Sequence, residues 1–232
     1  MPMSFQGKIL VDGDLLRDPD RTPWLTQTIA MLNRLWGSRT GGIVIREILA
    51  SSKVVKIVPY YDTTDIKNAV AVPRDYPAAY HKDSPLRRAD DARVIPGWGG
   101  TGGGSDVRLE YTPWRFTAFH RPILLLHEMV HATEQQRGVL YCNDMQKSGF
   151  DTVAEFDAIV VENICRSEFG VFIRRNHHSY DPLEGELMVG SWEEMKRRLD
   201  SFRARMPHMT HALARVDVPF NPLRPGARGA PR

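Results

Sequence analysis

The chain has 232 residues, of which 42% are hydrophobic and 25% are charged, as is typical of one soluble globular domain. Its longest aliphatic run, Ile123 to Leu126, is far too short for a membrane helix, and the N-terminus lacks an apolar run of signal-peptide length. The net charge of +3 equals the charge of residues 212–232 alone, so the near-neutral remainder predicts no nucleic-acid-binding surface.

The first half of the chain predicts two helices, a short strand and a long irregular region. An N-capping threonine followed by proline predicts a helix over residues 22–37, and a second helix is expected to begin at residue 40. Residues 53–59 are typical of a short strand. Polar residues and prolines over 60–96 indicate loops or a hairpin, and the glycine-rich residues 97–104 indicate a flexible turn.

The second half predicts one strand followed by helices. Residues 106–112 alternate between apolar and charged side chains, which favours a half-exposed edge strand. A proline begins and a glycine ends a helix over 122–137, and a capping threonine begins another over 152–169. Ser191 and Glu194 form a capping box for a helix to about residue 205, and a short helix is expected after Pro207.

This order of elements is typical of an α+β domain. We expect residues 1–206 to form that single domain, with residues 1–20 as a candidate linker. Residues 207–232 are expected to be a Pro- and Arg-rich C-terminal tail, either an extended strap or a solvated end. The chain has two cysteines, Cys142 and Cys165, which exclude a disulfide framework. They are expected to be buried free thiols, with a single disulfide as the alternative.

The strongest motif is His127-Glu128-Met129-Val130-His131, which matches H-E-x-x-H within the helix expected over 122–137. Residues at i and i+4 share one helical face, so both imidazoles can bind one metal ion, and zinc suits nitrogen and oxygen ligands. Glu128 then lies where it can take a proton from metal-bound water and pass it to the leaving amine. The pattern predicts a zinc peptidase, with a helix that merely bears polar histidines as the alternative.

A catalytic zinc site needs a third protein ligand. Glu134 and Arg137 occupy the positions where a metzincin would have glycine and histidine, so that class is excluded. As in gluzincins, a glutamate on the next helix is the expected ligand, and Glu155 in its first turn is our first choice. Glu162 lies two turns further along a similar face, and Asp157 points about 200° away; both remain open.

Two further expectations concern the substrate. His177, His178 and Tyr180 follow the third-ligand helix, and Tyr180 is our choice to stabilise the oxyanion, with ordinary loop residues as the alternative. The strand over 106–112 directly precedes the metal helix, and as an edge strand it would bind an extended peptide substrate by main-chain pairing.

The chain resembles the NleD-like (HopH-like) zinc metallopeptidase effectors of bacteria, which include toxin domains of type VI secretion spike (VgrG) and Rhs-type proteins. The similar stretches span much of residues 40–185: GGIVIREILASSKVVKIVPY (41–60), GTGGGSDVRLEYTP (100–113), ILLLHEMVHA (123–132), AEFDAIVVENICRSE (154–168) and NHHSYDPL (176–183). The family pattern often reads Glu-Glu-Phe on the second helix, where this chain has Ala154 before Glu155. The resemblance therefore supports Glu155 as the third ligand.

The resemblance implies a zincin fold, bound Zn²⁺ and proteolysis of a protein in a target cell. Delivery would use a specialised secretion system without a classical signal peptide, and an immunity protein is a candidate partner. Two other hypotheses stay open: a zinc-stabilised module that binds a protein without cutting it, and a housekeeping metallopeptidase. Nucleic acid and membrane insertion are not expected.

Overall fold

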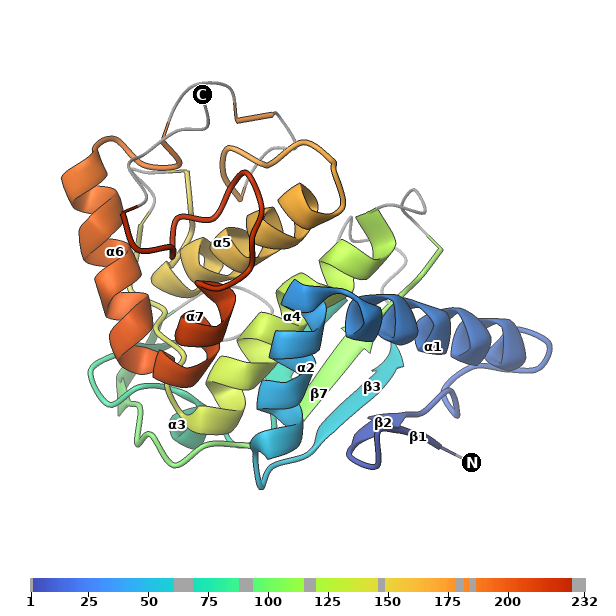
Figure 1. Cartoon of the computed structure of the whole chain (residues 1–232). Helices are drawn as coiled ribbons and strands as arrows, with labels where there is room; N and C mark the ends of the chain where they lie inside the picture. The colour runs from blue at the N-terminus through green and yellow to red at the C-terminus, as the bar shows by residue number, and fades with distance from the viewer. Residues whose placement is uncertain are drawn as a thin grey trace.

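The computed structural model describes residues 2–60, 69–87, 94–114, 120–145, 149–177, 182–183 and 187–226; for residues 86–87 and 94–98 it describes the main chain alone. Within these residues a five-stranded sheet and seven helices form a mixed α+β fold, which confirms the expected class (Figure 1). None of the described helices is both long and apolar enough to cross a membrane.

The main sheet is mixed, with strand order β1-β2-β3-β7-β4. The strands are β1 (Met3–Phe5), β2 (Ile9–Val11), β3 (Val55–Pro59), β7 (Val107–Tyr111) and β4 (Ala69–Pro73). Strands β2, β3 and β7 run parallel, whereas β1 and β4 are antiparallel to their neighbours. A separate hairpin pairs β5 (Pro85–Arg87) with β6 (Val94–Gly99), so the expected flexible turn over 97–104 begins within a strand.

Strand β7 is an interior strand, so the expectation of an edge at residues 106–112 is wrong. Its main chain pairs with β3 on one side and with β4 on the other. The covering strand β4 has the sequence AVAVP, which lies in the stretch expected to be irregular. Its alanines and proline carry weak strand propensity, and packing beside β7 decides its conformation. Among the strands that the structure describes, β4 is therefore the edge of the sheet on this side.

The helices largely follow their expected bounds. The N-terminal helices are α1 (Arg21–Gly37) and α2 (Arg39–Ala50), and the later ones are α3 (Tyr76–Ala79), α4 (His120–Arg137), α5 (Val153–Glu168), α6 (Trp192–Arg205) and α7 (Pro207–Leu213). The Oγ of Ser38 accepts a hydrogen bond from the Gly41 amide, so α2 begins before Thr40. Thr152 and Ser191 cap α5 and α6 as expected, because each hydroxyl accepts a hydrogen bond from the main-chain amide three residues later.

Helix α4 runs through the centre of the molecule (Figure 1). It contacts β4 and β7 on one side and α5 on the other, while α1 also packs against the sheet. Leu125, Leu126, Met129 and Val130 on α4 are completely buried. This burial on several sides holds the H-E-x-x-H segment rigidly between the sheet and α5.

The helix α4 ends at a tightly packed glycine. Gly138 has a φ of +67°, and a Cβ added there would lie 2.4 Å from the carbonyl carbon of Gly102. Both the left-handed conformation and the close approach of another main-chain segment therefore require glycine at this position.

The C-terminal segment is packed against the domain through Leu223. Pro207 begins α7 as expected, and the following residues bury Val216, Phe220 and Leu223 against the helices. A solvated end is thus wrong for this part, because its apolar side chains between the prolines bind it to the domain as a strap. Cys142 and Cys165 are both buried and free, as expected.

Candidate metal centre

Helix α4 presents two histidines on one buried face. His127 and His131 are one turn apart, and the two residues are 4% and 7% exposed. Their Nε2 atoms lie 3.2 Å apart, with the rings nearly perpendicular. The helical spacing of four residues thus directs two imidazole nitrogens to one point, as the motif predicts.

Glu155 in the first turn of α5 faces the same point. Its Oε2 lies 3.1 Å from Nε2 of His127 and 3.4 Å from Nε2 of His131. Zinc bound tetrahedrally at ~2.0–2.1 Å has ligand atoms about 3.3–3.4 Å apart. The three donor atoms therefore form a triangle whose sides are close to the spacing expected for three ligands of one tetrahedral zinc ion.

Contacts among the histidines and glutamates of this cluster shift their pKa values. Burial alone would raise the pKa of the Glu155 carboxyl, but the neighbouring imidazoles of His131, His177 and His127 hold it well below its usual range. Burial alone would lower the pKa of His127, but hydrogen bonds with Glu155 and Glu162 raise it to about 9. The site therefore stabilises positive charge beside an ionised carboxylate, and a metal cation can replace the protons.

The two other candidate ligands lie elsewhere. Glu162 is buried behind His127, where its Oε2 lies 3.1 Å from Nδ1 rather than Nε2, and Arg166 donates to its Oε1 at 2.7 Å. Asp157 faces away from the cluster and pairs with Arg205 of α6. Of the three carboxylates considered, Glu155 alone lies within 3.5 Å of Nε2 of both histidines.

Glu128 is half-buried and contacts the edge of the sheet. Its Oε2 accepts a hydrogen bond of 2.9 Å from the main-chain amide of Ala71 on β4. The side-chain amide of Gln135, two turns further along α4, donates a hydrogen bond to the carbonyl oxygen of Ala71 at 2.9 Å. Two side chains of α4 thus bind both outward-facing main-chain groups of one residue in the edge strand, which fixes the carboxylate of Glu128.

A third histidine joins the cluster, and sequence reasoning did not select it. The ring of His177 stacks on that of His127, with centroids 5.8 Å apart, and its Nε2 lies 3.3 Å from Oε2 of Glu155. Its Nδ1 lies 2.9 Å from a carboxylate oxygen of Asp151. One ligand atom each from His127, Glu155 and His177 lie within 4.8 Å of one another.

In the sequence, His177 stands out only as one of the polar residues that follow α5. Among these residues we chose Tyr180, not His177, to stabilise the oxyanion. Tyr180 and His178 lie outside the described residues. Asp151 gave no separate signal, because it precedes the cap of α5 and reads as an ordinary turn residue.

Comparison with protein-family models and with curated proteins finds no match for this chain. The argument for function therefore depends on the residues themselves and on their geometry.

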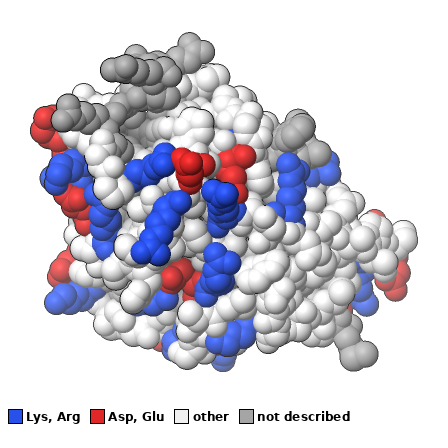
Figure 2. Space-filling view, viewed as in Figure 1, with Lys and Arg blue, Asp and Glu red and all other residues white. Residues whose placement is uncertain are grey.

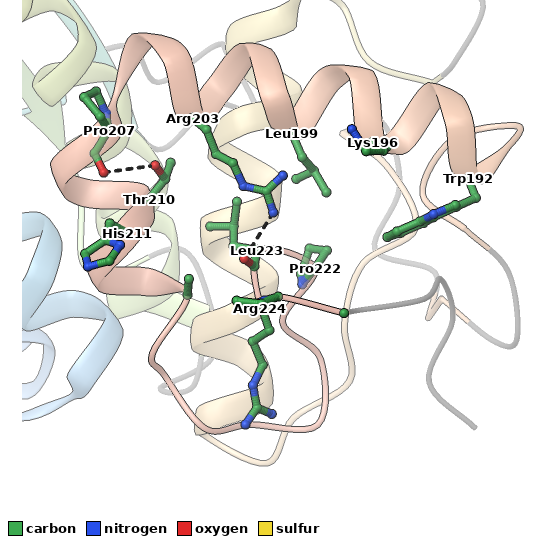
Figure 3. A pocket seen from close by; sticks show the side chains of 13 residues that line it. Trp192, Lys196, Leu199, Arg203, Pro207, Thr210, His211, Pro222, Leu223 and Arg224 are labelled. Atoms are coloured by element: carbon green, nitrogen blue, oxygen red, sulfur yellow. Dashed lines mark hydrogen bonds between the residues drawn. The ribbon is translucent and has the colours of Figure 1, made fainter.

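A groove of about 670 Å³ lies between α6, α7 and the C-terminal strap (Figure 3). Trp192, Lys196, Arg203 and Arg224 are among its lining residues. Lys and Arg side chains gather on this face, with Asp and Glu between them (Figure 2). Asp200 pairs with both Lys196 and Arg203, so these cations are largely compensated. The described residues that line the groove form no cluster of catalytic or metal-binding groups, so the centre on α4 is the candidate site.

Proposed function

We propose that this protein is a zinc-dependent endopeptidase with a zincin-like fold, in which His127, His131 and Glu155 hold the metal. The observation that carries the proposal is the triangle of Nε2, Nε2 and Oε2 atoms, with sides of 3.1–3.4 Å. It coincides with an H-E-x-x-H segment on a buried helix, so the donor set and the spacing both suit zinc.

The remaining residues supply the proton chemistry of peptide hydrolysis. Bound zinc would supply a Lewis acid and lower the pKa of coordinated water. Glu128 takes the proton released when water attacks the peptide carbonyl, and then gives it to the departing amine. The hydrogen bond from the Ala71 amide holds the Glu128 carboxylate in place during both transfers.

We assign His177 to the carbonyl oxygen of the substrate. Nδ1 of His177 lies 2.9 Å from a carboxylate oxygen of Asp151, which orients the ring so that an N–H at Nε2 can donate to the negative charge that develops on the substrate oxygen. An extended peptide would lie beside β4, since this strand contacts Glu128, and it would bind main-chain groups other than those of Ala71, which Glu128 and Gln135 already occupy.

The resemblance to NleD-like effectors supports a toxin or effector role. In that role the protein would be delivered by a specialised secretion system and would cleave a protein in the target cell. An immunity protein would then protect the producing cell.

The zinc content of purified, dialysed protein tests the metal assignment. We expect about one zinc per chain, and its loss in a His131→Ala variant. A Glu128→Gln variant should keep the zinc but lose cleavage of peptide libraries and toxicity on expression. Absence of zinc from reconstituted unmutated protein would contradict the proposal.

A second candidate is a zinc-stabilised binding module without catalysis. The observation that favours it is the position of His177, because a fourth protein ligand would close the site. The absorption spectrum of the cobalt-substituted protein distinguishes the two. A spectrum that does not respond to small anionic ligands, together with undiminished toxicity of the Glu128→Gln variant, would favour the module.

A further inference from the structure

We propose that Arg205 of α6 is a positioning residue of the metal centre, acting on His131 through Glu134. The proposal rests on the proposed function, because it concerns the zinc ligand His131. The H-E-x-x-H motif lies on α4, whereas Arg205 lies on α6, far along the sequence. The proposal therefore gives a residue outside the motif a role in metal affinity.

The first step is the pairing of Glu134 with His131. Glu134 follows His131 by three residues on α4 and is completely buried. Its Oε2 lies 3.7 Å from Nδ1 of His131, and neither atom has a hydrogen-bond partner among the residues that the structure describes. When Nε2 binds a metal, Nδ1 must carry the ring proton, and a small rotation brings it within bonding distance of Glu134. Glu134 therefore fixes the tautomer and ring orientation of this ligand.

The second step is the contact from α6. Nη1 of Arg205 donates to Oε1 of Glu134 at 3.1 Å and to the carbonyl oxygen of Val139 at 3.3 Å. Nη2 of the same guanidinium donates to Asp157 on α5, and the group stacks on the ring of Tyr141 at 5.6 Å. Its side chain is only 7% exposed. One arginine thus connects α6 with both α4 and α5.

The third step is energetic. Burying a guanidinium together with two acidic side chains costs free energy that their attraction only partly offsets, so apolar residues could fill this space as stably. Shared contact with Arg205 also keeps Glu134 and Asp157, two buried carboxyl groups, in fixed positions. This arrangement is better explained by orientation of His131 than by stability.

The other ligand on α4 has the same arrangement. His127 is backed by Glu162, to which Arg166 donates at 2.7 Å and Arg174 at 3.2 Å. Each histidine of the motif therefore has a buried carboxylate behind it and a buried arginine behind that carboxylate. Arg205 supplies this outer contact for His131 from α6.

The zinc dissociation constant, measured by competition with a chromophoric chelator, tests the proposal on the full chain. We expect Arg205→Met to weaken zinc binding by about 10–100-fold, the usual effect of losing an outer partner of a metal ligand. Arg205→Lys should lose less zinc affinity, because the lysine ammonium can still reach one of the two acidic side chains. Arg197→Met, an exposed arginine on the same helix, is the matched control and should bind zinc normally.

A double variant shows whether Arg205 acts through Glu134. Glu134→Gln with Arg205→Met should weaken binding no more than Glu134→Gln alone, since both changes remove one chain of contacts. The cobalt spectrum should shift in each Arg205 and Glu134 variant, as the ligand field of His131 changes. Unchanged zinc affinity and an unchanged cobalt spectrum in Arg205→Lys and Arg205→Met would overturn the proposal, as would losses that multiply in the double variant. Failure of the unmutated chain to bind zinc would instead reject the proposed function.

Discussion

The Oε2 atom of Glu162 lies 3.1 Å from Nδ1 of His127, and both side chains are almost completely buried. This contact makes Glu162 a support for a metal ligand instead of a ligand, since its carboxylate also receives hydrogen bonds from Arg166 and Arg174. Burial would raise the pKa of Glu162, but His127 and the two arginines lower it far below its usual range. The carboxylate is therefore ionised and fixes His127 with Nε2 toward Glu155.

Glu162→Gln should weaken zinc binding by about 10–100-fold. It should also lower the free energy of unfolding by about 3 kcal/mol, because it leaves two buried arginines without a counter-charge. Chelator competition and urea denaturation measure the two effects. Glu193→Gln on the exposed start of α6 is the control, and equal effects in both variants would contradict this role.

The zinc-free protein should lose stability as the pH rises from about 6.5 to about 9. His127 has a pKa raised from 6.5 to about 9 in the folded chain, so its protonated form stabilises the fold below 6.5 and this contribution disappears as the pH passes 9. The loss is about 3 kcal/mol at most. Urea denaturation in a chelator at pH 6 and pH 9 measures it.

Bound zinc should reverse the direction of that pH effect. Zinc requires neutral imidazoles, so its affinity and its stabilisation of the fold both rise over the same pH range. Denaturation with excess zinc is the comparison, and a zinc-free protein that is more stable at pH 9 than at pH 6 would contradict the assigned contacts.

Gly138→Ala should destabilise the protein more than Gly170→Ala. Both glycines have a φ of +67°, but a Cβ at Gly138 meets Gly102 at 2.4 Å whereas one at Gly170 meets nothing within 4 Å. Backbone strain costs about 1 kcal/mol at each position, and the clash adds several more at Gly138. Thermal unfolding of the two variants separates strain from collision, and equal losses would show that Gly102 yields freely.

Neither cysteine should react with a thiol reagent in the folded protein. Burial raises the pKa of the Cys142 thiol to about 12 and raises that of Cys165 further, so little thiolate forms at neutral pH. A chromogenic disulfide reagent should label neither thiol until denaturant is added, and then both. Rapid labelling of the native chain would show that one of them is accessible.

The local parts of this fold and site could be predicted from the sequence. Helix signals such as Thr152, Ser191 and Gly138 act over a few residues, and the histidine spacing on α4 follows from helical geometry. The Ala69–Pro73 strand could not be predicted, because its pairing with β7 is a tertiary contact that overrides weak propensity.

The residues that position the histidines of the site could not be predicted from the sequence either. Arg205 reaches Glu134 across 71 residues of sequence, and no spacing rule connects them. The sequence correctly predicts that Glu162 lies on nearly the same face of the helix as Glu155. It does not show which of these two carboxylates contacts Nε2 of the histidines and which contacts Nδ1. Distinguishing a ligand from its support requires atomic positions on two packed helices.

The contact of Glu128 with Ala71 has a consequence for how this protein can diverge. The groups that hold the carboxylate of Glu128 and the amide of Gln135 belong to the main chain of β4. The side chain at position 71 can therefore drift to any type that fits, except proline, without releasing the glutamate. Related chains could keep this part of the reaction geometry while sharing no identifiable residue in the strand that secures it.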